Sequence, residues 1–190
     1  MRVSLFAYAL ALLAPQVAHA LPSFQLPIAV DRISGKPARG PSKSTLISQG
    51  WGLDGPKIHP LNSTAFDWWY WDAVAPDFSV GVVAIAFTTT PAGLWDYMPD
   101  TGSATWIGAW FTWANGTEKS YIFPADEFTV KTVQDGSSAT LKGVDAGWSG
   151  RPDNSKYVVQ FDEKKAGIKG TFTLNSVRRH TNLILSQSGS

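Results

Sequence analysis

The chain has 190 residues, with 16 lysine and arginine residues against 15 aspartate and glutamate residues, and it contains no cysteine. A chain of this length fits one domain with a single hydrophobic core. The near balance of charge lacks the electrostatic footprint of a nucleic-acid-binding protein, and the absence of cysteine excludes both a thiol nucleophile and disulfide bonds.

Residues 1–20 have the pattern of a secretory signal peptide. Arg2 supplies the basic start, an apolar run follows over residues 3–14, and the Ala-His-Ala of residues 18–20 has the small side chains of a cleavage site. The apolar run is too short to cross a bilayer comfortably, and an uncleaved N-terminal anchor is the alternative. We therefore expect a secreted protein that has no membrane segment after cleavage.

Asn62 and Asn115 each begin an Asn-x-Ser/Thr triplet without a central proline. Such triplets accept N-linked glycans in the secretory pathway. We expect both asparagines to be glycosylated, although the triplets also occur by chance and support secretion less strongly than the signal peptide does.

Residues 21–65 contain six prolines, which fix the backbone and lack an amide donor. We expect neither a helix nor a central strand there, and we interpret the segment as a Pro-rich lead-in. Its basic residues lie among prolines and glycines, which favours a solvated, flexible stretch over a binding patch; they are Arg32, Lys36, Arg39 and Lys43.

From Phe66 onward, short β-branched and aromatic runs alternate with turn residues, which indicates an antiparallel sheet. We predict eight strands, at residues 66–74, 79–89, 104–113, 119–123, 127–134, 138–144, 157–162 and 167–175. Asn115-Gly116 is the best hairpin turn. The fold class is therefore all-β, a lipocalin-like antiparallel β-barrel or β-sandwich over residues 66–177, followed by a divergent polar tail at residues 178–190.

Aromatic residues concentrate in the first part of this domain, where eight of the nine tryptophans lie between residues 51 and 113. Strand alternation places Asp67, Trp69 and Trp71 on one face of the segment FDWWYWD, and Phe66, Trp68, Tyr70 and Asp72 on the other. The strand at residues 104–113 likewise has Trp106 and Trp110 on one face and Ile107, Phe111 and Trp113 on the other.

One face of each aromatic strand can pack in the core while the other lines an apolar ligand site. We predict five substrate-binding tryptophans: Trp68, Trp69, Trp71, Trp106 and Trp110. For any single tryptophan a core position is the commoner alternative. Asp67, Tyr70 and Asp72 are the candidate catalytic residues, because a carboxyl group beside indole rings is a general acid or a hydrogen-bond anchor; a turn or cross-strand role is the alternative.

The sequence lacks the motifs of several common chemistries. Beyond the signal, His59 and His180 stand in no metal-ligand spacing, and no phosphate-binding glycine loop is present. Residues 147–151 fail the Gly-x-Ser-x-Gly elbow because Arg151 replaces the last glycine. We therefore predict no metal site and no nucleotide site. If the protein is catalytic, its reaction should depend on positioning, desolvation, hydrogen-bond polarisation or proton transfer.

Residues 66–74, FDWWYWDAV, resemble the signature of a lipocalin-like family that includes carotenoid hydratases of the hydroxyneurosporene-synthase type, fungal Diels-Alderases and kievitone hydratase. The DGPK at residues 54–57 and the FTTT at residues 87–90 also fit, and the likeness runs from Gly50 to Val177. Trp71 stands where the family more often has phenylalanine.

The resemblance implies two lipocalin-like domains, a pocket between or within them, and no cofactor. This chain corresponds to the N-terminal domain, so a second domain or a partner chain would complete the pocket. Three functions remain open: a Diels-Alderase-like cyclase that forms decalins in polyketide biosynthesis, through Asp67, Trp68, Trp69 and Tyr70; a secreted hydratase of isoprenoid or prenylated phenolic substrates, through Asp67 or Asp72; and a non-catalytic carrier of apolar ligands. In each case the partner is an apolar small molecule such as a polyene or a prenylated compound.

Overall fold

A computed structural model describes residues 28–47, 50–94 and 99–176. The predicted signal peptide, the tail at residues 178–190 and Trp95 lie outside these ranges. The strands are β1 Ile28–Ser34, β2 Lys43–Ser44, β3 Ile58–His59, β4 Phe66–Val74, β5 Val80–Thr89, β6 Thr105–Trp113, β7 Glu118–Ala125, β8 Glu127–Val133, β9 Gly136–Lys142, β10 Ala146–Gly150, β11 Lys156–Glu163 and β12 Ile168–Asn175; two short 3-10 helices are η1 Pro91–Gly93 and η2 Lys164–Ala166.

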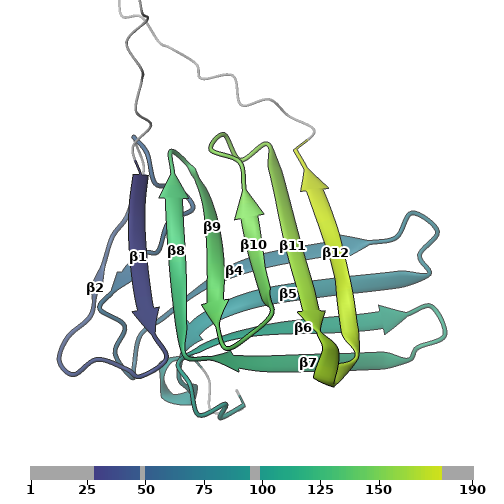
Figure 1. Cartoon of the computed structure of the whole chain (residues 1–190), viewed down its shortest axis with the longest axis horizontal. Helices are drawn as coiled ribbons and strands as arrows, with labels where there is room; N and C mark the ends of the chain where they lie inside the picture. The colour runs from purple at the N-terminus through teal and green to yellow at the C-terminus, as the bar shows by residue number, and fades with distance from the viewer. Residues whose placement is uncertain (1–27, 48–49, 95–98, 177–190) are drawn as a thin grey trace, which may run out of the picture.

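The strands form two main sheets in which all neighbours are antiparallel. One sheet has the order β1-β8-β9-β10-β11-β12, the other has the order β4-β5-β6-β7, and β2 pairs with β3 separately. The prediction of an all-β, antiparallel fold is confirmed. Within the described residues the two sheets do not join into a closed barrel. Their strands run crosswise, one sheet behind the other (Figure 1).

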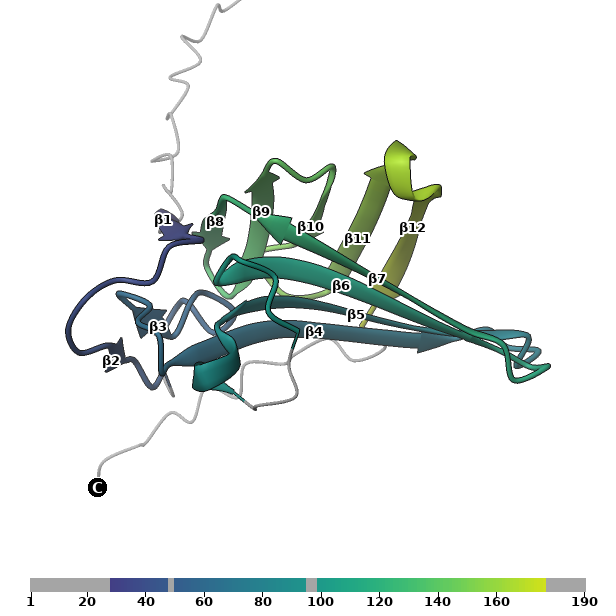
Figure 2. The same cartoon turned by 90° about the horizontal axis from the view of Figure 1, so that it is seen from below.

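The hydrophobic core lies between the two sheets, which Figure 2 shows edge on. The six-stranded sheet contributes Phe128, Val130 and Trp148 to it, and all three are buried. The four-stranded sheet contributes Trp69 and Trp71 together with small alanines. The small alanines leave room for the large rings that lie beside and opposite them.

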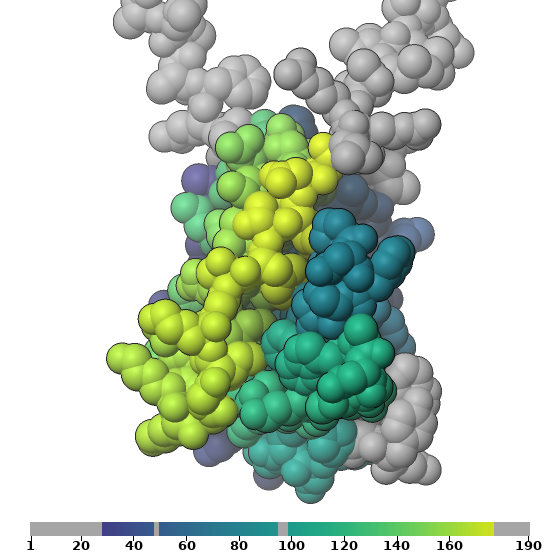
Figure 3. Space-filling view, turned by 90° about the vertical axis from the view of Figure 1, so that its right-hand side faces the viewer, coloured from purple at the N-terminus to yellow at the C-terminus, as the bar shows by residue number. Residues whose placement is uncertain are grey.

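All eight predicted strands are present, with ends that differ by no more than two residues. The Asn115-Gly116 turn is also confirmed: it joins β6 to β7, and Gly116 has the positive φ of 81° that favours glycine. Both long hairpins of the four-stranded sheet extend beyond β12 in Figures 1 and 2, and Figure 3 looks at these turns end on.

The segment at residues 21–65 contains more regular structure than its prolines suggest. It contributes β1, which pairs along its whole length with β8, from Ile28 opposite Val133 to Ser34 opposite Glu127. β1 lies at the edge of its sheet, and Ile33 and Leu61 of this segment are buried in the core. An edge strand needs backbone partners on one side only, which proline-flanked segments can still supply.

Strand β10 is the element that the sequence pattern misses within the β-rich region. Its sequence AGWSG lacks β-branched residues, and its glycines lie where neighbouring strands press closely. A Cβ at Gly147 would come 2.5 Å from the carbonyl oxygen of Ala139, and one at Gly150 would come 2.5 Å from the Tyr157 ring. The glycines therefore serve close packing inside the sheet.

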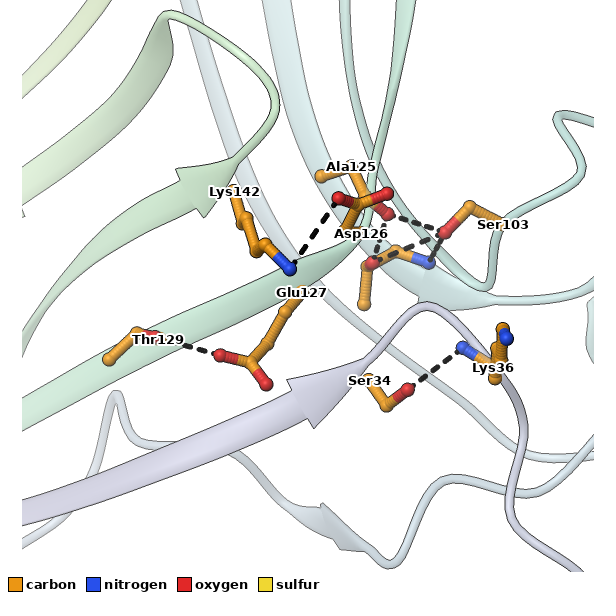
Figure 4. Close-up of polar contacts among 9 residues, drawn as sticks. Ser34, Lys36, Ser103, Ala125, Asp126, Glu127, Thr129 and Lys142 are labelled. Carbon is orange, nitrogen blue, oxygen red and sulfur yellow. Dashed lines mark hydrogen bonds and ion pairs between the residues drawn. The ribbon is translucent and has the colours of Figure 1, made fainter.

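The chain passes from one sheet to the other at Asp126, the single residue between β7 and β8 (Figure 4). Ser103 fixes this junction, because its hydroxyl donates to the carbonyl of Ala125 at 2.6 Å. The Lys142 ammonium lies 3.7 Å from the Asp126 carboxylate, but both side chains are more than 70% exposed, so this ion pair adds little stability. Among residues 28–47, 50–94 and 99–176, no helix is long and apolar enough to span a membrane.

Candidate functional site

The two faces of β4 have opposite environments. Trp69 and Trp71 are 5% and 6% exposed and point toward the six-stranded sheet, whereas Trp68 and Tyr70 are 41% and 52% exposed and point away from it. The alternation predicted for FDWWYWD is therefore present in the structure. One aromatic face packs in the core and the other is open to solvent.

Strand register brings the outward side chains of three strands together. Trp68 lies opposite Phe87, which lies opposite Trp106; Asp72 lies opposite Val83, which lies opposite Trp110. We call this surface the aromatic face, and it comprises Phe66, Trp68, Tyr70, Asp72, Val83, Ile85, Phe87, Trp106 and Trp110. Five of the eight side chains predicted to bind or act on a substrate lie on it: Trp68, Tyr70, Asp72, Trp106 and Trp110.

Four rings form a continuous row across the aromatic face. Phe66 stacks on Trp68 with ring centroids 5.3 Å apart, Trp68 meets Phe87 edge on at 6.1 Å, and Phe87 stacks on Trp106 at 4.2 Å. Trp106 is 1% exposed, and η1 lies on this side of the sheet at the end where β4 begins (Figure 2). The row therefore passes from an enclosed end at Trp106 to an open end at Phe66.

A glycine shapes the part of the aromatic face nearest Trp110. A Cβ at Gly108 would come 2.4 Å from Cη2 of the Trp110 indole, so this ring lies directly over the glycine backbone. The absence of a side chain at Gly108 lets the indole lie flat against the sheet. The indole therefore forms a flat part of the surface next to Ile85 of β5, which lies opposite Gly108 on one side and Tyr70 of β4 on the other.

Tyr70 and Asp72 are the polar groups that β4 contributes to the aromatic face. Within the described residues, neither the phenol nor the carboxylate has a hydrogen-bond or ion-pair partner. Asp72 is exposed and lies in register with Val83 and Trp110. Both polar groups are therefore free to hydrogen-bond a ligand that lies on the rings.

The other three predicted site residues, Asp67, Trp69 and Trp71, point to the inner side of the sheet. Trp69 and Trp71 pack against Trp148 with ring centroids 4.8 and 5.2 Å apart, and the Trp69 indole N–H donates to the carbonyl of Asp54 at 2.9 Å. The structure therefore places these two tryptophans in the core, and it does not bring them together with Trp106 and Trp110.

Asp67 is half-buried and its carboxylate is occupied by backbone amides. It accepts the Lys57 N–H at 2.6 Å and the Trp68 N–H at 3.0 Å. Burial raises its pKa, while the hydrogen bonds from the Lys57 and Trp68 amides and the Lys57 charge oppose the rise. In this arrangement Asp67 fastens the loop before β4 to the strand.

A second polar cluster, centred on Asp54, was missed by the sequence reasoning. The Asp54 carboxylate accepts hydrogen bonds from the hydroxyls of Ser137 and Tyr157, the latter at 2.6 Å, and Ser137 in turn accepts the Trp148 indole N–H at 2.9 Å. Lys57 donates its ammonium to the carbonyls of Gly52, at 3.1 Å, and Gly55. The available sequence signal for this cluster is the DGPK segment at residues 54–57, which contains both Asp54 and Lys57.

Burial dominates the electrostatics of this cluster. It raises the pKa of Asp54 against the opposing hydrogen bonds from Ser137 and Tyr157, and it lowers the pKa of Lys57 against the attraction of Asp67 and Asp54. Burial also raises the pKa of Tyr157, and the neighbouring Asp54 charge adds to the rise. The cluster holds the loop at residues 50–57 against β9 and β11, across an edge of the core.

The described part of the chain contains no group of three His, Asp or Glu side chains that could hold a metal ion. The polar chemistry that the aromatic face offers through the β4 side chains is a carboxylate and a phenol beside indole rings. Such a surface can orient an apolar molecule and transfer a proton to or from it.

Two known proteins with the same description are similar in sequence to this chain. No family model matches the chain. It is 31% identical over 171 residues to the quinolone epoxide rearrangement protein asqO of Emericella nidulans, an alignment that covers 85% of this chain and 46% of that protein. It is 29% identical over 145 residues to the quinolone epoxide rearrangement protein penF of Penicillium thymicola, covering 70% of this chain and 38% of that protein. The chain is thus similar, over most of its length, to less than half the length of these two curated relatives.

Proposed function

We propose that the chain contributes to an isomerase of secondary metabolism, which rearranges or cyclises an apolar small molecule on the aromatic face. The observation that carries this proposal is the gathering of Trp68, Tyr70, Asp72, Trp106 and Trp110 on the face of the four-stranded sheet that points away from the six-stranded sheet. The similarity to two proteins named for the rearrangement of a quinolone epoxide supports the same class of reaction.

The exposed rings of Phe66, Trp68 and Tyr70 would hold a flat or extended apolar substrate by stacking, and the polar groups would act at its reactive end. A rearrangement keeps every atom of the substrate, so its acid or base must return the proton that it takes or gives. Asp72 is the group for that exchange, and the Tyr70 phenol is positioned on the same strand face to hydrogen-bond a developing oxyanion.

The aromatic face also needs a cover for such a reaction. Asp72 is exposed, and a general acid is more effective where water is excluded. The curated relatives are more than twice as long as the part that this chain matches. A second domain or a partner chain that covers the aromatic face would desolvate Asp72 and enclose the substrate.

Two finer forms of the proposal follow from the lipocalin-like family likeness of FDWWYWD. In one, the reaction is an intramolecular Diels-Alder cyclisation that forms a decalin, with the ring row selecting the folded conformer of a polyene. In the other, the protein is a hydratase, in which Asp72 protonates an alkene and water adds to the cation. The Asp72 carboxylate, which has no partner among the described residues and lies in register with Trp110, supports the hydratase as the second candidate. A carrier without turnover is the remaining alternative.

The experiment that distinguishes these functions measures product mass. The purified chain is incubated separately with a quinolone epoxide, a polyene tetramic acid and a prenylated phenol. The products are then separated by chromatography, and their masses are measured by mass spectrometry. Isomerisation gives a new compound of unchanged mass, hydration adds the mass of one water, and a carrier changes tryptophan fluorescence without any new product. If none of the substrates is converted and none changes the fluorescence, the proposal is wrong.

Variants of the aromatic face test the site itself. Trp68→Ala should weaken substrate binding, and Asp72→Asn should slow turnover while leaving binding nearly unchanged, because the amide keeps the shape but cannot exchange the proton. Phe78→Ala is the matched control: Phe78 is 77% exposed, lies in the β4–β5 turn and is not part of the aromatic face. An effect of Phe78→Ala equal to that of Trp68→Ala would contradict the assignment of the site.

A further inference from the structure

A small hollow lies beside β1, among residues from the segment that precedes β4. It is a hollow of about 110 Å³, and we call it the β1 hollow; its lining residues are Arg32, Ile33, Ser34, Lys36, Ala38, His59, Pro60 and Leu61. None of these residues belongs to the aromatic face. The hollow therefore has no part in the proposed reaction.

The polar side of the β1 hollow is basic. Arg32 and Lys36 carry positive charge at neutral pH, His59 can gain one, and none of the lining residues is acidic. Within the described residues these three side chains have no ion-pair or hydrogen-bond partner. Lys43 lies opposite His59 in the β2–β3 pair and adds a further positive charge near the rim.

A hydroxyl donor completes this polar side. The Ser34 oxygen accepts the backbone N–H of Lys36 at 3.0 Å (Figure 4), which leaves the Ser34 hydroxyl proton free to donate. Asp31 precedes Arg32 on β1, and on the neighbouring strand Glu127 lies opposite Ser34 and accepts a hydrogen bond from Thr129 at 3.4 Å. Glu127 forms no ion pair with Arg32 or Lys36.

The other side of the β1 hollow is apolar. Ile33 and Leu61 are 5% and 6% exposed and form part of the core, and Pro60 and Ala38 lie beside them. Ala38 and Pro60 are only half-buried, so an apolar chain would bury surface against them, whereas a bare inorganic anion would gain nothing from their carbons. The combination of unpaired cations with an apolar wall is complementary to an amphiphilic anion.

We propose that the β1 hollow binds the carboxylate end of an apolar organic acid, such as a fatty or polyketide acid. The carboxylate lies between Arg32 and Lys36, with the Ser34 hydroxyl as a third donor. The first carbons of the acid lie on Ala38 and Pro60, which are partly exposed, and the rest of the chain extends out of the hollow, which is too small to hold more.

Isothermal titration calorimetry on the full 190-residue chain tests this proposal with three probes: octanoate, 1-octanol and inorganic phosphate. Octanoate should bind more tightly than 1-octanol, which lacks the charge, and more tightly than phosphate, which lacks the apolar chain. Octanoate binding should also weaken as salt is added, because its carboxylate pairs with partly exposed cations. Equal affinity for octanoate and either other probe would overturn the proposal.

Charge-removing variants locate the site. In Arg32→Gln/Lys36→Gln the octanoate affinity should fall by about tenfold or more, because two charge-assisted hydrogen bonds are lost. Lys131→Gln is the matched control, since Lys131 is an exposed residue of the neighbouring strand β8 and does not line the hollow. Circular dichroism checks that each variant is folded; Lys36→Gln alone, at an exposed position, should show a smaller loss. Unchanged octanoate binding in the double variant, as would follow from binding at the aromatic face, also overturns the proposal.

Discussion

Trp68 and Trp69 are adjacent in sequence and differ in the face of β4 on which they lie, so the same substitution should have different effects at the two positions. Trp69 is 5% exposed, lies 4.8 Å from the Trp148 ring and donates its indole N–H to the carbonyl of Asp54. Trp69→Ala removes a large buried ring and a hydrogen bond. We expect it to lower the free energy of unfolding by about 3–5 kcal/mol.

Trp68→Ala should be much milder. Trp68 is 41% exposed and contacts the exposed Phe66 and the buried Phe87, with ring centroids 5.3 and 6.1 Å away. Aromatic pairs contribute about 0.5–1.5 kcal/mol each, and less where solvent reaches them, so we expect a loss of about 1 kcal/mol. Because small domains have total stabilities of about 5–15 kcal/mol, the first variant approaches unfolding and the second does not.

Urea unfolding followed by far-ultraviolet circular dichroism measures both variants, since this signal does not depend on the tryptophan that is removed. If Trp69→Ala fails to fold, Trp69→Phe serves instead and should still be less stable than Trp68→Phe. Equal losses for the two positions, or a larger loss at Trp68, would refute the assignment of β4 faces on which the proposed site rests.

Three further predictions concern other parts of the chain. Gly108→Ala should change stability by no more than about 1 kcal/mol, because the flexible Trp110 ring can move aside, yet it should alter binding of an apolar probe by fluorescence; a large loss of stability would contradict this. Burial raises the pKa of Asp54 in the folded state, so the stability that its protonation adds is complete below the unfolded-state pKa and is lost as pH rises through the folded-state pKa. In Asp54→Asn, the free energy of unfolding in urea should therefore decline less steeply from about pH 4 to 8 than it does in the unsubstituted chain. An unchanged pH dependence would contradict this prediction. If the predicted signal peptide is cleaved, secreted material should lack it on N-terminal sequencing and should shift on a gel after glycosidase treatment, a shift reduced by Asn62→Gln and by Asn115→Gln.

Local periodicity predicted eight of the strands in the β-rich region well because each of these eight is long enough to show alternation, whereas the five-residue β10 is not. β4 and β6 also have their two faces where the pattern places them. Alternation assigns a side chain to a face, but it does not say which face meets the second sheet. That choice depends on Trp148, which is distant in sequence and fills the space next to Trp69 and Trp71.

The Asp54 cluster could not be predicted from the sequence for a related reason. Its hydrogen bonds join residues that are 83 and 103 positions apart, Asp54 with Ser137 and Asp54 with Tyr157. No local pattern encodes such a separation. Likewise, Asp67 resembles a catalytic acid in sequence because it stands between aromatics, and only the backbone amides of Lys57 and Trp68 reveal its occupied carboxylate.

The order of strands in the four-stranded sheet also bears on how the chain acquires its fold. β4, β5, β6 and β7 follow one another along the chain, and the longest connection between them is the 15 residues from β5 to β6, whereas β1 must find β8 about 100 residues later. We expect the meander to form first, with apolar rings on both of its sides until the six-stranded sheet covers one of them. Until then both faces of the four-stranded sheet expose aromatic rings, so partly folded chains can associate with one another through either face. A tendency of the folding chain to self-associate is thus a consequence of a binding surface on the outer face of the sheet.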